Sequence, residues 1–246
     1  MARYDFNAQR LFVEADLAEA ATIACTAEQS NYLRNVLRLK PGDRILVFNG
    51  RDGEWQAELA EAGKRTISLR VGSQVRVQEG GPDIDYLFAP LKRARLDYLV
   101  QKATEMGVAR LEPVLTRRTT PERLNMQRMR ANAIEAAEQC GILRVPELLA
   151  PEKLERVIAD WDATRPLLFC DEGCDAGDPL AALAKLRPGP LALLVGPEGG
   201  FDETERARLL AKPFVTRLSL GPRILRADTA AVAALALVNA VLGDWR

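Results

Sequence analysis

The chain has 246 residues, 48% of them apolar, which is enough for one large or two ordinary globular domains. Lysine plus arginine equals aspartate plus glutamate at 34 each, so no global positive charge indicates a nucleic-acid partner, and any such surface must be local. The absence of histidine excludes histidine-based triads and leaves Arg, Asp, Glu, Tyr and backbone groups for chemistry.

Membrane and metal partners are not expected. No apolar stretch reaches the length of a transmembrane helix, and the first residues, MARYDFNAQR, lack the apolar core of a secretory signal. We therefore expect a cytoplasmic protein. The four cysteines are widely spaced, which predicts no disulfide framework. Cys170 and Cys174 form a poor zinc site without histidine, so we expect no bound metal.

The N-terminal part of the chain predicts a short helix and then a small β domain. Thr26 and Gln29 have the spacing of a capping box at the start of the helix. Its apolar stripe comprises Leu33, Val36 and Leu37. Residues 42–77 contain short β-branched and aromatic runs broken by glycine turns, which is typical of a small antiparallel barrel or sandwich. The segment QEGGPD at 78–83 predicts a linker.

After residue 83, strands and helices alternate. Strands are expected at 85–91, 109–116, 167–170, 191–195 and 215–220, with helices at 93–107, at about 122–140 and from Asp228 to near the C-terminus. Strands separated by helices predict an α/β domain with a mostly parallel sheet. Asp228 is expected as the N-cap of the last helix. The apolar residues of that helix cover most of its circumference, which predicts burial in the fold and against a partner subunit.

Three strand ends carry candidate ligand-binding residues, because ligands bind at the carboxyl ends of the strands in open parallel sheets. They are Asp171 with Glu172, the turn GPEGG at 196–200, and the turn GPR at 221–223. Each is also an ordinary strand-to-helix turn, but two Gly-Pro turns at successive strand ends favour a binding site. Neither turn matches a phosphate-binding motif, and Glu198 would repel a pyrophosphate, which favours a nucleoside without phosphate.

The motif LLVGPEGGFDETE at 193–205, followed by LSLGPRILRADTA at 218–230, resembles the C-terminal signature of the ribosomal RNA small subunit methyltransferase E family, which belongs to the SPOUT methyltransferases. Other stretches agree with this resemblance. They are YLRNVLRLKPGD, VFNGRDGEW, QKATEMGV and IEAAEQCGILRVPEL. The resemblance therefore covers nearly the whole chain.

This resemblance implies a PUA-like β-barrel at 1–78 and a SPOUT α/β domain at 79–246, with a mostly parallel sheet and a trefoil knot. It implies S-adenosylmethionine as cofactor, N3 of one uridine in 16S ribosomal RNA of the small subunit as the methyl acceptor, and a homodimer. The implied cofactor pocket consists of Phe169, Val195, Gly196, Pro197, Glu198, Gly199, Gly200, Leu218, Leu220, Gly221, Ile224 and Leu225.

The chemistry of N3 methylation indicates which side chains to consider as catalytic. When the N3 proton leaves, negative charge spreads onto the carbonyl oxygens of uracil, and fixed cations stabilise it. Arg223 and Arg226, beside the expected pocket, are the candidates for this role. Asp228 is a candidate proton acceptor, with helix capping as its alternative role, and Glu198 is the other nearby carboxylate.

RNA contacts are expected from local basic clusters, because phosphate contacts supply most of the affinity. The segment TRRTTPERLNMQRMR at 116–130 has five arginines and one acid. The candidate residues are Arg3, Arg10, Arg34, Arg38, Arg117, Arg118 and Arg123. For each cluster the alternative is a solvated charged surface. The target base would have to be unstacked to reach the pocket.

The sequence departs from the family pattern at Asn31, Ile142 and Asp228, where histidine, arginine and glutamate are usual. The lost cation at Ile142 puts one RNA contact in doubt, and Arg144 is a candidate replacement. Two other readings remain open. One is a non-catalytic RNA-binding protein, and the other is the same enzyme class acting on a different RNA site.

Overall fold

The computed structural model describes residues 8–61, 66–119, 123–173 and 177–245. The chain divides into two compact units. The first contains the described residues up to Gly80 together with Ala137–Arg144, and the second contains Gly81–Ala136 and the described residues from Val145 onward. Within the described residues, no helix is long and apolar enough to cross a membrane.

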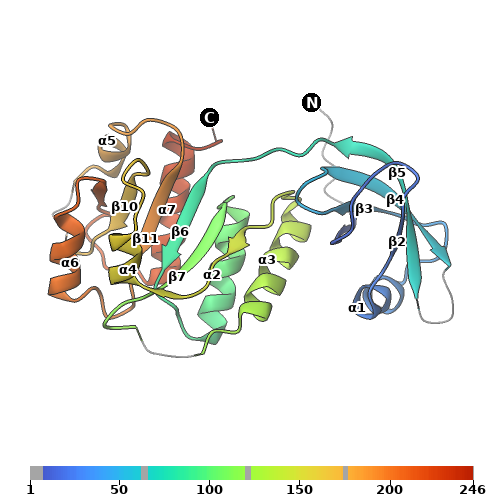
Figure 1. Ribbon diagram of the computed structural model, residues 1–246, viewed down its shortest axis with the longest axis horizontal. Helices are drawn as coiled ribbons and strands as arrows, with labels where there is room; N and C mark the ends of the chain where they lie inside the picture. Colours follow the sequence, from blue (N-terminus) through green and yellow to red (C-terminus); the bar gives the residue numbers. More distant parts are fainter. Residues whose placement is uncertain (1–7, 62–65, 120–122, 174–176, 246) are drawn as a thin grey trace. The chain divides into compact units, whose positions relative to one another are not determined.

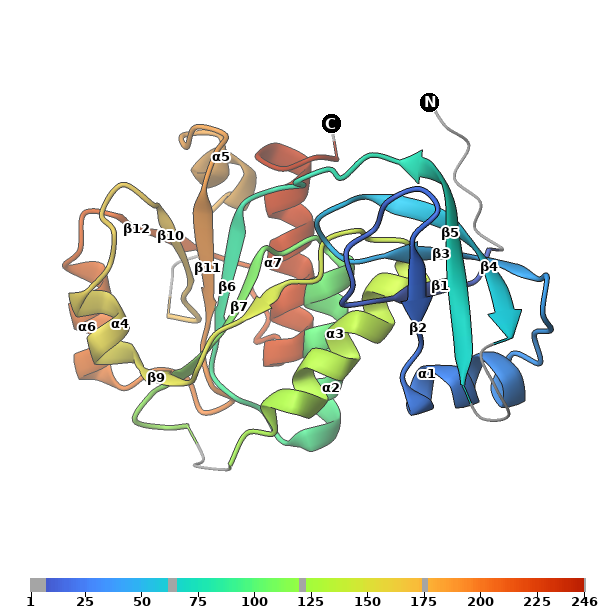
Figure 2. The same cartoon turned by 45° about the vertical axis from the view of Figure 1, so that its right-hand side comes forward.

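The first unit is built on a five-stranded sheet with the order β1-β3-β4-β5-β2. Its strands are β1 (Arg10–Phe12), β2 (Thr22–Ala24), β3 (Arg44–Phe48), β4 (Glu54–Glu61) and β5 (Ile67–Arg76). All pairs are antiparallel, as predicted, except β1 with β3, which is parallel. The strands curl over one another (Figure 2). Their core includes Val47 and Leu69, both fully buried.

The predicted capping box at the first helix, α1 (Ala27–Asn31), is confirmed. The Thr26 hydroxyl accepts a hydrogen bond from the Gln29 backbone N–H at 3.1 Å, and the Gln29 side-chain oxygen accepts one from the Thr26 N–H at 2.9 Å. The chain then continues as one π-helical segment, Tyr32–Val36. This wider turn changes which residues face inward. Leu33 is buried as predicted, but Val36 is 61% exposed, so its place in the apolar stripe was wrong.

Arg10 is a buried structural residue, and the prediction that it contacts RNA was wrong. Its side chain is inside the first unit and the residue is only 6% exposed. The Arg10 Nε donates to Glu54 Oε1 at 2.9 Å, and the same carboxylate accepts two hydrogen bonds from Arg76. A buried carboxylate needs such partners, so the guanidinium of Arg10 is not available to a phosphate.

The second unit contains the predicted α/β sheet. The strands β6 (Ile84–Phe88), β7 (Arg110–Leu115), β8 (Glu147–Leu148), β10 (Leu167–Cys170), β11 (Leu191–Val195) and β12 (Val215–Leu218) run in the order β12-β10-β11-β6-β7-β8, and β9 (Glu152–Lys153) pairs with β7. Every pairing is parallel. The predicted mostly parallel sheet is therefore confirmed.

Helices cover both faces of this sheet (Figure 1). They are α2 (Arg93–Glu105), α3 (Met126–Cys140), α4 (Leu154–Ala159), α5 (Pro179–Leu183), α6 (Glu203–Leu210) and α7 (Ala227–Val241). Neighbouring strand residues point to opposite faces, so Tyr86 and Leu193 pack with α2, α3 and α7, while Leu87 and Leu194 pack with α4 and α6. The sheet is thus buried on both sides, as expected for a parallel sheet.

Asp228 is not the N-cap of the last helix. The helix α7 begins at Ala227 with Arg226 at the cap position, because the Ala230 N–H already donates to the Arg226 carbonyl at 2.7 Å. Asp228 lies in the first turn, where its carboxylate accepts a hydrogen bond from the Thr229 N–H at 2.9 Å. Its negative charge also interacts favourably with the positive end of the helix dipole.

Candidate active site

The carboxyl ends of β10, β11 and β12 lie side by side, because the three strands are parallel neighbours. In the register, Cys170 is opposite Val195 on one side and opposite Leu218 on the other. A cavity of about 430 Å³ opens at this edge of the sheet. Its volume lies within the range of roughly 300–1,000 Å³ that is usual for small-molecule sites.

Most of the predicted pocket residues line this cavity. They are Val195, Gly196, Pro197, Glu198, Gly200, Leu218, Leu220, Gly221, Ile224 and Leu225, and Asp171, Glu172, Arg223 and Arg226 also line it. Two predicted residues do not. Phe169 is fully buried behind the cavity, where it packs edge-on against Phe201 with ring centroids 5.0 Å apart. Gly199 faces a neighbouring hollow, against the side chain of Arg118.

Four lining residues were not expected from the sequence. They are Arg95, Phe201, Ala227 and Ala230. Most of these are chain neighbours of predicted residues, and extending each motif by a few positions would have included them. Arg95 is different, because it comes from α2 and is remote in the sequence. Its guanidinium forms an ion pair with Glu198.

The segment 195–201 after β11 is the more firmly held wall of the cavity. The Gly200 N–H donates to the Pro197 carbonyl at 2.9 Å, closing a tight turn. Arg118 Nη1 donates to the carbonyl of Gly199 at 2.8 Å. A Cβ on Gly196 would collide with the ring of Phe201, so only glycine allows this close packing.

The opposite wall, residues 219–226 after β12, is open from Gly221 onward. Gly221, Pro222, Arg223 and Ile224 are all exposed, and Ile224 is 88% exposed despite its apolar side chain. Gly221 has a φ of +95°, and a Cβ there would meet no atom within 4 Å. Arg223 and Arg226 are also exposed, and neither forms an ion pair with a described residue.

A buried carboxylate holds together the loop after β10. Asp171 is 6% exposed and accepts hydrogen bonds from Arg206 Nε at 2.9 Å and from Arg217 Nε at 2.9 Å. Both arginines also donate to the Gly173 carbonyl. Burial alone would raise the pKa of Asp171, but the hydrogen bonds from Arg206 and from the Gly173 N–H outweigh it and lower the pKa. The network therefore joins β10, α6 and β12 with a charged carboxylate.

Asp228 does not line the cavity. Burial raises the pKa of Tyr86 well above its ordinary value, and the charges of Cys170 and Asp228 add smaller contributions in the same direction. The Tyr86 hydroxyl is buried and has no hydrogen-bond partner among the described residues. Burial also raises the pKa of the Cys170 thiol to about 12, so this cavity-lining group is a neutral thiol at physiological pH.

The predicted RNA-contacting arginines lie in different places. Arg117 donates from its backbone to Glu205 at 2.9 Å and from its guanidinium to Asp202 at 3.0 Å, so it helps to position the start of α6. Arg118 holds the Gly199 carbonyl, and Arg123 is exposed. The structure places Arg34 and Arg38 on the exposed surface of the first unit. Arg3 lies outside the described residues.

Comparisons with known proteins identify the family of this chain. A family model described as "RNA methyltransferase domain" matches residues 79–239, and one described as "RNA methyltransferase PUA domain" matches residues 26–72. Ribosomal RNA small subunit methyltransferase E of Rickettsia conorii is 31% identical over 236 residues, which cover 94% of each chain. The Synechocystis enzyme of the same name is 33% identical over 240 residues, covering 96% of this chain and 78% of the relative.

A solved structure shows the same fold. The crystal structure of ribosomal RNA small subunit methyltransferase E from Neisseria gonorrhoeae, bound to S-adenosyl methionine, matches with a TM-score of 0.85 and 25% identity, covering 98% of this chain and 100% of that one. The expected fold class, a PUA-like β domain and a SPOUT α/β domain, is confirmed, while the trefoil knot stays a prediction. The chain therefore belongs to the ribosomal RNA small subunit methyltransferase E family.

Proposed function

We propose that this protein transfers a methyl group from S-adenosylmethionine to N3 of one uridine in 16S ribosomal RNA of the small subunit. The observation that carries the proposal is the cavity at the carboxyl ends of β10, β11 and β12, where exposed arginines border a glycine-lined pocket. The relatives that match almost the whole chain are named ribosomal RNA small subunit methyltransferase E.

The cavity residues fit S-adenosylmethionine. When bound, this cofactor supplies an electrophilic methyl group on a positively charged sulfur. Apolar side chains of Val195, Leu218 and Leu220 and the backbone of the glycine turns offer a surface for a flat nucleoside. The carboxylates of Glu172 and Glu198 are compatible with a cation and unfavourable to a phosphate. We propose that these residues hold the cofactor.

The protein's part in methyl transfer is to position the uracil ring and to stabilise negative charge. As the N3–H bond breaks, the electron pair that attacks the methyl group is shared with the two carbonyl oxygens. We propose that Arg223 and Arg226 stabilise this charge, because their guanidinium groups border the cavity and are not neutralised by a described carboxylate.

The proton acceptor is better sought inside the cavity than at Asp228. A group that takes the N3 proton must be within hydrogen-bond reach of the base. Asp228 does not line the cavity, whereas Glu172 and Glu198 do. Glu198 is paired with Arg95, while Glu172 is exposed at the cavity edge. We therefore propose these two carboxylates in place of Asp228.

Two further parts of the proposal concern assembly and location. We propose a homodimer, supported by the apolar residues on the partly exposed side of α7, such as Leu237 and Val241, which pack only in part against the core of the second unit. We propose a cytoplasmic location because ribosomal RNA is the substrate. Sedimentation of the purified protein tests the dimer directly.

The proposed function is tested by transfer of labelled methyl from S-adenosylmethionine to small ribosomal subunits that lack the native modification. Mass spectrometry then locates the product. We expect N3-methyluridine at one position. Cofactor binding without any transfer would favour the non-catalytic RNA-binding reading, and transfer to a different RNA would keep the enzyme class but change the substrate.

The same assay tests the role of Arg226. We expect Arg226→Gln to lower kcat by about 10²–10³, the effect of removing one group that stabilises developing negative charge. The dissociation constant for S-adenosylmethionine, measured by calorimetry, should stay close to the wild-type value. Normal turnover by the variant would remove Arg226 from the mechanism. Arg187→Gln, which removes an exposed cation from another part of the unit, is the matched control.

A further inference from the structure

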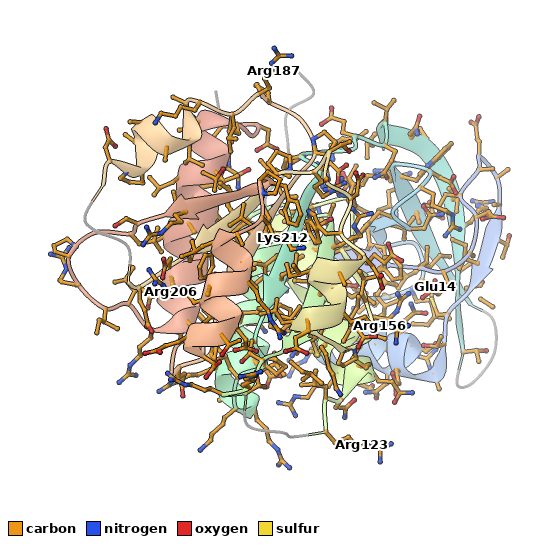
Figure 3. The ribbon with its side chains drawn as sticks, turned by 60° about the vertical axis from the view of Figure 1, so that its left-hand side comes forward. Glu14, Arg123, Arg156, Arg187, Arg206 and Lys212 are labelled. Atoms are coloured by element: carbon orange, nitrogen blue, oxygen red, sulfur yellow. The ribbon has the colours of Figure 1, made fainter. Side chains whose placement is uncertain are left out.

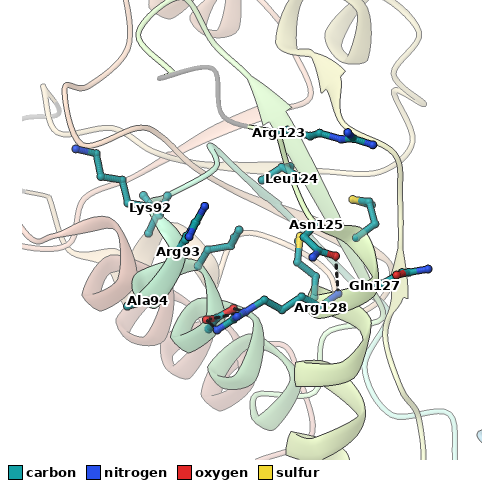
Figure 4. Close-up of a pocket in the computed structure, with 13 residues that line it drawn as sticks. Lys92, Arg93, Ala94, Arg123, Leu124, Asn125, Gln127 and Arg128 are labelled. Atoms are coloured by element: carbon teal, nitrogen blue, oxygen red, sulfur yellow. Dashed lines mark hydrogen bonds and ion pairs between the residues drawn. The ribbon is translucent and has the colours of Figure 1, made fainter.

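A second and larger cavity lies in the same unit, between the start of α2 and the start of α3 (Figure 4). Its volume is about 1290 Å³, against about 430 Å³ for the proposed cofactor cavity. We call it the basic groove, and we define it by Lys92, Arg93, Asp97, Arg123 and Arg128. No part of the mechanism proposed above uses this groove.

The groove has an excess of positive charge. Of its four cations, only Arg128 is paired, through a 2.6 Å contact between its Nη2 and Asp97 Oδ2. Lys92, Arg93 and Arg123 are exposed, and none of them forms an ion pair with a described residue. Lys92 is also the N-cap of α2 without a side-chain cap bond, and the first turns of α2 and α3 contain no acidic residue. Both helix starts therefore add to the positive potential.

The basic groove is connected to the cofactor cavity by a small hollow. This hollow shares Leu91 and Lys92 with the groove and shares Pro197 and Glu198 with the cofactor cavity. Arg118 lines the hollow between them. The charge of Glu198 is balanced there by Arg95. The three cavities thus follow one another through shared lining residues, and each of them has cations in its lining, from Arg226 at the cofactor cavity to Arg123 at the groove.

From this path we infer that the basic groove binds the sugar-phosphate backbone of the RNA strand next to the target uridine, with Lys92, Arg93 and Arg123 contacting phosphates. The inference rests on the proposed function. A single strand must run out of the cofactor cavity once its base is inserted there, and its phosphates need cations that no described carboxylate neutralises, as at Lys92, Arg93 and Arg123. Apolar side chains such as Leu96, Leu124 and Met129 also line the groove, so a protein partner is the alternative that the test must exclude.

The test is the salt dependence of RNA binding by the full chain carrying Lys92→Gln, Arg93→Gln and Arg123→Gln together. The probe is an unmodified 16S ribosomal RNA transcript, and binding is measured by filter retention between 50 and 300 mM KCl. Each lost contact to single-stranded RNA should reduce the slope of log K against log salt by about 0.7, so the slope should fall by about 2. At about 0.15 M salt, each lost contact should weaken binding by a factor of about 4. The loss of all three should therefore lower the affinity by roughly 50-fold.

The matched control is Arg187→Gln, which removes one exposed cation at the opposite end of the second unit from Arg123 (Figure 3). It should leave the slope unchanged. In the triple variant, the KM for RNA should rise, while kcat at saturating RNA and the dissociation constant for S-adenosylmethionine stay near wild type. An unchanged cofactor affinity also shows that the triple variant is folded.

Failure of this inference can be told apart from failure of the proposed function. If the wild-type protein transfers no methyl group to small subunits, the proposed function is wrong. If the wild type is active but the triple variant keeps its salt slope, the groove does not bind RNA. If the triple variant keeps that slope but loses activity only on assembled subunits, the groove takes a ribosomal protein, and the inference is overturned.

Discussion

The two walls of the cofactor cavity differ in how they are held. The segment 195–201 is fixed by a turn hydrogen bond, by Arg118, by the Arg95 ion pair and by the packing of Gly196 on Phe201. In the segment 219–225, the structure gives no hydrogen bond to another described residue, and residues 221–224 are exposed. Both segments contain a Gly-Pro turn after a parallel strand. Similar local sequences are therefore held in place by very different numbers of contacts.

This difference predicts separate roles for the two walls, with one binding the cofactor and the other contacting the RNA. A firmly held wall keeps the cavity shape constant and avoids loss of entropy when a ligand binds. An open wall that presents arginines can contact a second ligand that arrives from solvent. We therefore expect substitutions in 195–201 to affect cofactor affinity first, and substitutions in 219–226 to affect turnover on RNA first. The following variants test this comparison.

Breaking the Asp171 network should have the largest effect. Asp171→Asn leaves Arg206 and Arg217 without their carboxylate, and breaking a buried pair costs about 3–5 kcal/mol. Both arginine side chains are about one-third exposed, so we expect the lower end of this range. The substitution should lower the free energy of unfolding by about 3 kcal/mol. Urea unfolding measures it. A loss below about 0.5 kcal/mol, the range of ordinary surface substitutions, would mean that this network does not hold the site.

The loss of stability caused by Asp171→Asn should depend on pH, because the pKa of Asp171 is lowered in the folded protein. The pKa in the folded protein lies below the ordinary 3.8, so the stabilisation is fully present above 3.8 and is lost as the pH falls through the folded value. The stability difference between wild type and Asp171→Asn should therefore be constant from pH 7 to 5 and shrink below 3.8. A difference that stays constant down to pH 3 would contradict the assignment.

Gly196→Ala tests the firmly held wall. The added Cβ would collide with Phe201, whose ring is kept in place by Phe169. Overpacking of this kind costs about 1–3 kcal/mol, and we expect about 2 kcal/mol, largely as weaker binding of S-adenosylmethionine. Calorimetry gives the dissociation constant. Unchanged affinity would show that the wall yields easily and that the contrast between the two walls is wrong.

Gly221→Ala is the matched change on the open wall, and it should have the smallest effect. No atom lies within 4 Å of the added Cβ, so the cost is only backbone strain at a φ of +95°, about 1 kcal/mol after the exposed loop relaxes. Cofactor affinity should change less than in Gly196→Ala, while turnover on RNA should fall because the neighbouring arginines are displaced. Equal losses of cofactor affinity in the two variants would remove the distinction.

Much of the second unit could be predicted from local patterns. The strand at 191–195 matches the predicted range, and the helix at 93–105 ends two residues before the predicted end at Gly107, whose φ of +78° suits a position just after a helix. The capping box at Thr26 could likewise be predicted from the sequence, because its two hydrogen bonds join residues that are three positions apart. The resemblance of two C-terminal motifs to one family identified nearly all of the cavity wall.

What the sequence by itself determined was the type and extent of the elements and the family, since these depend on neighbouring residues and on motifs. Only the tertiary structure decided which charges are free. Arg10 and Arg226 are both arginines near a strand or helix start, yet one is buried against Glu54 and the other is exposed at the cavity. The partner of Arg10 is 44 residues away, so no local pattern contains it. Ion pairing and burial depend on packing between distant segments, and they are settled only when the chain folds.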